Sequence, residues 1–176
     1  MTNNNIILTG FMGTGKSTVG KLLAEKMGYK FVDTDETIMS RCNMSVAEIF
    51  KSQGEALFRK MERELALELS TQERLVISTG GGMLLDSVNA EALEGKKSKG
   101  KIFCLIADPD EIIARVSSDN TIERPLLKVA DPKARMAELL QERKERYSRF
   151  IQLDTTGITP EAVCSNIIDM LNNNQF

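Results

Sequence analysis

The sequence predicts an α/β domain with a short, mainly parallel β-sheet flanked by helices. Short apolar stretches suited to buried strands alternate with longer stretches in which apolar residues recur at helical spacing. A glycine-rich loop joins the first strand-like stretch to the first helical one, which is where parallel sheets place ligand-binding loops. The 176 residues suit one domain, 1–176, because they contain no internal repeat, low-complexity linker or second core.

The predicted strands are short apolar runs, and most of them end at polar or glycine-rich residues. The run Ile102–Ile106 has the strongest strand character, since all five of its residues are apolar. The predicted strands lie at 6–8, 31–32, 75–77, 102–106 and 151–153. In a parallel sheet, ligands bind beyond the carboxyl ends of the strands, so ligand-binding residues are expected in the segments 10–18, 33–35 and 79–82.

Start and stop signals place the predicted helices. Gly28 closes the first helix, which contains Val19, and a proline opens the helices that begin at Pro109, Pro132 and Pro160. The Pro109 helix should reach about residue 116 and the Pro132 helix about residue 147, with an irregular polar stretch at 117–123 between them. The other helices are predicted at 36–42, 45–52, 55–71 and 87–94.

A phosphate-binding loop follows the first predicted strand. Residues 10–18 match the pattern G-x-x-x-x-G-K-S/T and lie between a strand and a helix, as the motif requires. Backbone N–H groups and the positive end of the helix dipole face an anion in such a loop. The motif places Lys16 at the β- and γ-phosphates of a nucleotide and the Ser17 hydroxyl at Mg²⁺. A glycine-rich turn that merely starts a helix is the alternative, and the correct flanks disfavour it.

Composition excludes several classes of function. The net charge of −2 gives no general affinity for nucleic acid or acidic membrane surfaces. No apolar run approaches the roughly 20 residues that cross a bilayer, and residues 1–5 lack a signal-peptide pattern, so we expect a cytoplasmic protein without a membrane partner. The absence of histidine excludes Ser-His-Asp and Cys-His catalysis and imidazole zinc sites. Proton transfer must therefore use carboxylates, lysine or water.

Two aspartates follow the second predicted strand. Asp33 and Asp35 are spaced so that an extended chain points both side chains to one side. Either can cap the next helix, because Asp is a common N-cap residue. Beside a phosphate loop, one carboxylate can instead hold Mg²⁺ through water while the other accepts the proton of a hydroxyl group. The residues by themselves leave both interpretations open.

Arg59 and the glycines at 80–82 also have two interpretations each. Arg59 can form an i,i+4 pair with Glu55, or its guanidinium can bind the carboxylate of a substrate in a bidentate way. Three consecutive glycines carry a large entropic cost, so close approach of the backbone to a ligand explains them better than a tight turn.

Two further candidate arginines do not directly follow a predicted strand. Arg124 follows the polar 117–123 stretch, where it can belong to a plain loop or to a mobile lid that brings a cation to the transferred phosphoryl group. Arg143 lies in a charged run that also contains Arg146, and most residues of such a run form a solvated helix face.

The ordered set of segments resembles the shikimate kinases, which are small kinases of the nucleoside-monophosphate-kinase type. The resemblance extends from about Ile6 to Leu171 and includes 10–18, 33–35, 54–59, 79–82, 124–127 and 142–147. It implies a three-layer P-loop kinase fold with substrate-binding helices at about 33–62 and a lid at about 115–127. It also implies ATP-dependent phosphorylation of the 3-hydroxyl of shikimate, a step toward chorismate and the aromatic amino acids. A monomer is expected from the same resemblance.

The resemblance also implies roles for individual residues. Asp35 would bind the shikimate hydroxyls and Arg59 and Arg143 its carboxylate, with Arg146 as the alternative to Arg143. The Gly80, Gly81 and Gly82 backbone would line the same pocket. Asp33 and Ser17 would support Mg²⁺, and Lys16, Asp35 and Arg124 would be the catalytic residues. The residues implied to bind ATP are Gly13, Thr14, Gly15, Lys16, Ser17, Thr18, Arg115, Arg124 and Pro160.

Two other functions compete with this one. A related P-loop enzyme such as a gluconate kinase or an adenylate kinase has the same phosphate loop, although a nucleotide acceptor gives no reason for Asp33 and Asp35 beside three glycines. A nucleotide-binding regulator that has lost catalysis is the second alternative. The presence of Lys16, Asp35 and all the arginines above disfavours it.

Overall fold

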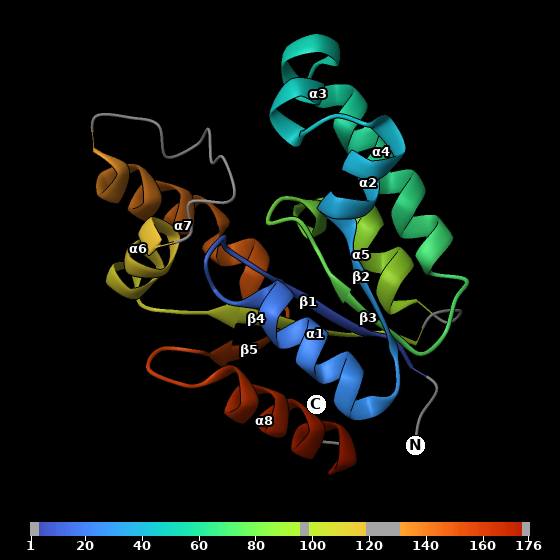
Figure 1. Cartoon of the computed structure of the whole chain (residues 1–176), viewed down its shortest axis with the longest axis vertical. Coiled ribbons are helices and arrows are strands. Elements are labelled where there is room, and N and C mark those ends of the chain that lie inside the picture. The colour runs from blue at the N-terminus through green and yellow to red at the C-terminus, as the bar shows by residue number, and fades with distance from the viewer. Residues whose placement is uncertain (1–3, 96–98, 119–130, 174–176) are drawn as a thin grey trace.

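A five-stranded parallel sheet with strand order β2-β3-β1-β4-β5 forms the centre of the structure (Figure 1). The computed structural model describes residues 4–95, 99–118 and 131–173. The strands are β1 (Ile6–Gly10), β2 (Lys30–Asp33), β3 (Leu75–Ser78), β4 (Lys101–Ile106) and β5 (Ile151–Asp154). Each strand expected from the apolar runs is present, extended by one or two residues, and the α/β fold with a parallel sheet is confirmed.

The helices begin and end close to the positions that their sequence signals indicate. They are α1 (Lys16–Met27), α2 (Thr34–Cys42), α3 (Val46–Gln53), α4 (Glu55–Leu69), α5 (Ser87–Glu94), α6 (Pro109–Ser118), α7 (Pro132–Ser148) and α8 (Pro160–Asn172). Gly28 ends α1 in the left-handed conformation, and Ser45 starts α3 with a capping box to Glu48. A short 3₁₀ helix, η1 (Met83–Leu85), was not predicted from the sequence.

Alternation along the strands divides the core into two faces. Ile6 and Leu8 of β1 pack with α1 and α8 on one face, whereas Ile7 packs with α4 and α5 on the other. The sheet is therefore the middle of three layers. Tyr147 in the last turn of α7 and Phe150 just after this helix pack in the same layer as α4 and α5.

The strand order brings three polar segments together. Because β1 lies beside β3, and β3 lies beside β2, the segments 10–18, 33–35 and 79–82 leave neighbouring strands at the same edge of the sheet. Helices α2, α3 and α4 lie on one side of this edge, and α6 and α7 lie on the other (Figure 1). Within the described residues, no helix is both long and apolar enough to span a bilayer.

Arg124 and most of the expected lid, 115–127, lie outside the described residues, which do not include 119–130. The part of this segment that is described, 115–118, is the end of α6.

Candidate active site

The phosphate loop wraps around a compact internal hydrogen-bond network. Gly15 has a φ of 92°, a conformation that side-chain-bearing residues rarely adopt, and it directly precedes α1. The Thr14 hydroxyl donates to the Phe11 carbonyl at 2.8 Å. The Lys16 ammonium donates to the carbonyls of Gly10 and Phe11 at 3.0 and 2.8 Å. The loop thus holds the ammonium group at the carboxyl end of β1, next to the start of α1.

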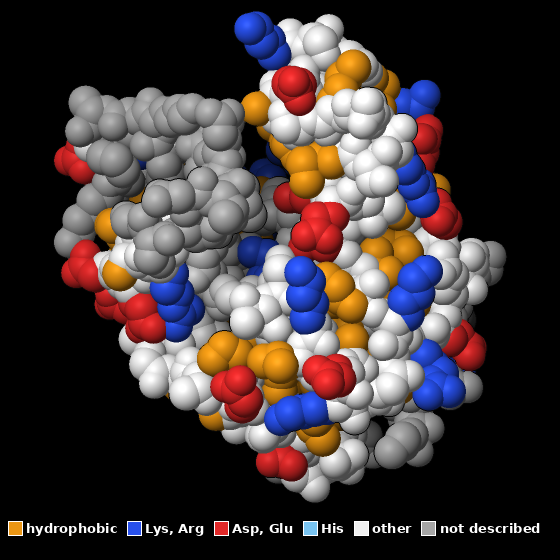
Figure 2. Space-filling model, in the orientation of Figure 1, with side chains coloured by type: hydrophobic (Ala, Val, Ile, Leu, Met, Phe, Trp, Pro, Cys, Tyr) orange, Lys and Arg blue, Asp and Glu red, His pale blue; other side chains and the backbone are white. Residues whose placement is uncertain are grey.

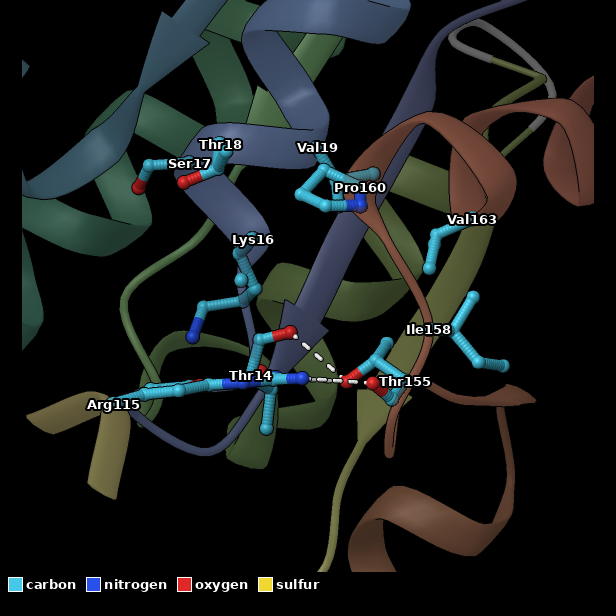
Figure 3. Close-up of a pocket in the computed structure, with 12 residues that line it drawn as sticks. Thr14, Lys16, Ser17, Thr18, Val19, Arg115, Thr155, Ile158, Pro160 and Val163 are labelled. Carbon is cyan, nitrogen blue, oxygen red and sulfur yellow. Dashed lines mark hydrogen bonds between the residues drawn. The ribbon is translucent and has the colours of Figure 1, made fainter. Parts of the chain in front are cut away.

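An open cavity of about 410 Å³ lies along this loop and extends to α6 and α8 (Figure 3). Arg115 lies at one wall, where it donates to the Thr155 carbonyl at 2.8 Å and pairs with Glu111. Pro160 lies on the α8 side of the cavity. The lining residues are Gly13, Thr14, Gly15, Lys16, Ser17, Thr18, Val19, Arg115, Thr155, Ile158, Pro160 and Val163.

Ser17 and Asp33 meet beside the loop. The Ser17 hydroxyl donates to Asp33 Oδ2 at 2.8 Å and lies 3.3 Å from the Ser78 hydroxyl. Asp33 Oδ1 accepts from the Asp35 and Glu36 amides, so the capping interpretation is correct for Asp33. Within the described residues, no cluster of three or more acidic, Cys or His side chains could hold a metal by itself. A hydroxyl and a carboxylate fit Mg²⁺ that takes its other ligands from phosphates and water.

Asp35 lies in the first turn of α2 with one carboxylate oxygen buried. Oδ1 has no hydrogen-bond partner among the described residues. Burial, and secondarily the neighbouring Asp33 carboxylate, raises the pKa of Asp35 from 3.8 to about 6, although Lys16 and Arg59 oppose the shift. The group therefore changes protonation state just below neutral pH, as a carboxylate that accepts a proton from a hydroxyl group must be able to do.

Arg59 is held by two glutamates of its own helix, α4. Its Nε and Nη2 donate to Glu55 Oε1 at 3.1 and 2.7 Å, so the i,i+4 pair expected from the spacing is present. Its Nη1 donates to Glu62 Oε2 at 2.8 Å. The Glu62 side chain is only 1% exposed, whereas that of Glu55 is 67% exposed. Burial raises the pKa of Glu62 to about 7 while Arg59 opposes the shift.

Each of the three glycines lies against one of the side chains singled out in the sequence. A Cβ on Gly80 would lie 2.4 Å from Asp35 Oδ1, and one on Gly82 would lie 2.9 Å from Arg59 Nη1. A Cβ on Gly81 would lie 3.5 Å from Arg143 Nη1. The glycine run therefore allows an aspartate and two arginines from α2, α4 and α7 to converge on one backbone segment.

Arg143 and Arg146 point to different places. Arg143 Nη1 donates to the Gly81 carbonyl at 3.4 Å, and its guanidinium carbon lies 5.5 Å from the centre of the Phe11 ring. The Tyr147 hydroxyl donates to the same Gly81 carbonyl. Arg146 is exposed on α7. Figure 2 shows a hollow beside the α2–α4 side of the molecule, with basic and acidic side chains at its wall.

Sequence reasoning missed Glu62, Thr155 and the contact between Phe11 and Arg143. A signal for Glu62 was present, because it follows Phe58 by four residues and precedes Leu65 and Ala66 in the apolar stripe of α4. A glutamate in such a stripe is buried and needs a partner. Thr155 has no comparable signal, since it follows the last strand without any motif.

The parallel sheet, the phosphate loop and a second polar site at the neighbouring strand ends define a P-loop kinase. A family model described as shikimate kinase matches residues 12–172. A shikimate kinase from Thermodesulfovibrio yellowstonii is 46% identical over 165 residues, which cover 93% of this chain and 92% of the relative. The chain belongs to the shikimate kinase family, whose members transfer phosphate from ATP to an alcohol group.

Solved structures agree with this assignment. A shikimate kinase from Acinetobacter baumannii, solved in complex with shikimate, has a TM-score of 0.89 at 31% identity, covering 99% of this chain and 96% of that one. A shikimate kinase from Aquifex aeolicus has a TM-score of 0.76 at 35% identity, covering 97% and 98%. A gluconokinase from Sinorhizobium meliloti has a TM-score of 0.54 at 17% identity, covering 99% and 98%, and shares the fold alone.

Proposed function

We propose that the protein transfers the γ-phosphoryl group of ATP to the 3-hydroxyl of shikimate, in the route to chorismate and the aromatic amino acids. One observation carries the choice of acceptor: Asp35, Arg59 and Arg143 converge on the 80–82 backbone beside the phosphate loop. An acceptor that has both a carboxylate and hydroxyl groups matches two arginines and one aspartate. A phosphate acceptor without a carboxylate would leave the two guanidinium groups without that partner.

The donor end of the site is the cavity along α1. The loop amides and Lys16 would bind the phosphates of ATP, and the adenine would lie between the Arg115 and Pro160 sides of the cavity. Arg115 suits this position because Glu111 and the Thr155 carbonyl fix its guanidinium plane. Ser17 and Asp33 would hold Mg²⁺, which supplies charge neutralisation at the β- and γ-phosphates.

The acceptor end is the group of side chains around 80–82. Arg59 and Arg143 would bind the carboxylate of shikimate, and Asp35 would accept a hydrogen bond from its hydroxyl groups. An ionised Asp35 can also accept the proton of the attacking hydroxyl, since its pKa of about 6 leaves it ionised at neutral pH. A dependence of kcat on the protonation of Asp35 would distinguish proton removal from orientation of the hydroxyl alone.

Charge stabilisation supplies most of the rate in phosphoryl transfer. Lys16 lies beside the loop that would bind the phosphates, and we assign Arg124 the same task as part of a lid at about 115–127. Closure of this lid would exclude water from the γ-phosphate and so suppress hydrolysis of ATP. We also propose a monomeric, cytoplasmic protein with no nucleic-acid or membrane partner. The net charge of −2 supports the absence of a general affinity for nucleic acid or acidic membrane surfaces.

The decisive experiment measures ADP release from Mg-ATP with shikimate, gluconate, AMP or no acceptor. We expect release that depends strongly on shikimate and not on the other two, and that stops when EDTA removes the metal. Equal turnover of gluconate would contradict the choice of acceptor. ATP binding without release under any of these conditions would support the alternative of a nucleotide-binding regulator.

A further inference from the structure

The two arginines assigned to the acceptor carboxylate have partners of different charge. Arg59 donates to two carboxylates, Glu55 and Glu62, at 2.7 and 2.8 Å. Arg143 contacts the Phe11 ring and the Gly81 carbonyl, and neither group carries a charge. Within the described residues, Arg59 is therefore neutralised by its surroundings, whereas Arg143 retains its positive charge.

The ring that contacts Arg143 belongs to the phosphate loop. Phe11 directly follows Gly10 at the end of β1, and its carbonyl accepts from Lys16 at 2.8 Å. The side chain is 1% exposed and packs against Ile112, Met136 and Leu139 of α6 and α7. The position of the ring is thus fixed by the core on one side, and its π-face lies 5.5 Å from the guanidinium carbon of Arg143.

An aromatic face attracts a guanidinium group without cancelling its charge. A carboxylate in the same place would orient Arg143 equally well but would compete with the carboxylate of an incoming acceptor. The Arg59–Glu62 pair has the opposite arrangement. The carboxylate of Glu62 orients the Arg59 guanidinium through a hydrogen bond, but it also neutralises the positive charge of that group. The two arginines are therefore suited to different tasks.

We propose that Phe11 is a positioning residue for Arg143, holding its guanidinium against the 80–82 backbone, so that Arg143 supplies the net positive charge that attracts an anionic acceptor. Arg59 then supplies oriented hydrogen bonds with little net charge. This inference rests on the proposed function, because it needs an acceptor with a carboxylate. It adds a residue of the donor loop to the set that determines acceptor binding.

The first test replaces the ring by an aliphatic side chain. In Phe11→Leu, we expect the KM for shikimate to rise about three- to tenfold while the KM for ATP changes less than about twofold. The matched control is Leu139→Val, which disturbs the same apolar cluster without removing the ring. It should lower the Tm without a selective effect on shikimate. An equal change in both KM values for Phe11→Leu would show that the ring only supports the loop, and would overturn the inference.

A double-mutant cycle tests whether Phe11 acts through Arg143. Once Arg143→Gln has removed the guanidinium, Phe11→Leu should change the KM for shikimate less than about twofold further. A full additional three- to tenfold loss in that background would contradict a role through Arg143. If Arg143→Gln itself leaves acceptor binding unchanged, this inference and the role of Arg143 both fail. Lack of shikimate-dependent turnover in the unmodified protein would instead overturn the proposed function.

Salt dependence separates the two arginines. Because salt screens the attraction between the acceptor carboxylate and the net positive charge near it, the KM for shikimate should rise with KCl concentration, and Arg143→Gln should flatten this dependence. The paired replacement of Arg59→Gln with Glu62→Gln removes a positive and a negative group together. It should raise the KM but leave the salt dependence largely intact, at pH 8, where Glu62 is ionised. Flattening in the paired variant, with none in Arg143→Gln, would reverse the assignment of charge and contradict the inference.

Discussion

Gly80 lies in direct contact with the buried oxygen of Asp35: a Cβ on Gly80 would be 2.4 Å from Oδ1. No side chain fits at position 80 unless the carboxylate moves. The conformation of the glycine segment and the position of the Asp35 carboxylate are therefore determined together. Gly82 has the same relation to Arg59, since its Cβ would lie 2.9 Å from Nη1.

This geometry predicts different kinetic effects for two neighbouring replacements. Gly80→Ala displaces Asp35, so we expect kcat to fall at least about tenfold. Gly82→Ala displaces the end of a longer and more flexible side chain, so we expect mainly a higher KM for shikimate, by about three- to tenfold. Steady-state kinetics with shikimate varied at saturating ATP would measure both. A higher KM for ATP in either variant, with shikimate kinetics unchanged, would contradict the placement of these glycines at the acceptor.

Asp35 should limit activity at low pH. Its pKa of about 6 means that activity falls as the pH drops through 6, because the protonated carboxyl cannot take up the proton of the acceptor hydroxyl and is a weaker hydrogen-bond acceptor than the carboxylate. The dependence of kcat/KM for shikimate on pH between 5 and 8.5 would measure this. If kcat follows the same curve, Asp35 takes part in the chemical step, whereas an effect on KM alone indicates orientation of the acceptor. A profile that is flat from 5 to 7 would contradict both roles.

The same raised pKa predicts a gain of stability in Asp35→Asn. The carboxyl binds its proton more tightly in the folded state, with a pKa of about 6 against 3.8, so its contribution to stability falls as the pH rises from about 4 to 6. Above that window, replacing the buried carboxylate should stabilise the fold by on the order of 2 kcal/mol, with loss of turnover. Thermal unfolding at pH 4 and pH 8 tests this, and the gain must be larger at pH 8. A lower Tm than the unmodified protein at pH 8 would argue against an uncompensated charge at Asp35.

Replacement of Arg143 and replacement of Arg146 should have very different effects on the KM for shikimate. Arg143 contacts Gly81 and the Phe11 ring, whereas Arg146 is exposed on the same helix. Arg143→Ala should raise the KM for shikimate by about ten- to a hundredfold, as expected for loss of a charge-assisted contact. Arg146→Ala is the matched control and should change it less than about twofold. The reverse pattern would assign the acceptor carboxylate to Arg146.

Lys16→Met should abolish most of the turnover and keep the fold. The proposed role of Lys16 is to supply a positive charge beside the transferred phosphoryl group, so we expect its removal to lower kcat at least about a hundredfold. Lys21→Met is a suitable control, since Lys21 lies on the same helix but is exposed over Phe31. Circular dichroism should show an unchanged spectrum for both variants. A folded Lys16→Met protein with normal kcat would refute the assigned role of the phosphate loop.

Local features were predictable from the sequence because they depend on residues close together along the chain. The phosphate loop at 10–18 is defined by glycine positions and by the strand and helix beside it. The prolines that open α6, α7 and α8 and the glycine that closes α1 act within one helical turn. The 3₁₀ helix Met83–Leu85 escaped prediction, because it consists of three residues and has no side-chain cap.

The face of α7 that is turned toward the core was predictable from the sequence in principle. Arg143 follows Met136 by seven residues and Leu139 by four, and it precedes Tyr147 by four, so it lies on the same helical face as these buried residues. Arg146 follows Leu139 by seven residues and so lies at the edge of this face, yet it is exposed, so the spacing alone does not separate the two arginines. The charged run 141–146 hid this pattern, because its composition indicates a solvated helix and only the spacing to the apolar residues indicates otherwise.

By itself, the sequence determined the class of fold, the phosphate loop and the identity of the polar segments that follow the strands. Only the tertiary structure decided that β3 lies between β1 and β2, which places 79–82 between the loop and Asp35. It also decided that Glu62 pairs with Arg59 and that Phe11 contacts Arg143. The reason is physical: a loop or a cap is specified by neighbours in the chain, whereas contacts between residues that are distant in the chain depend on how the strands and helices pack.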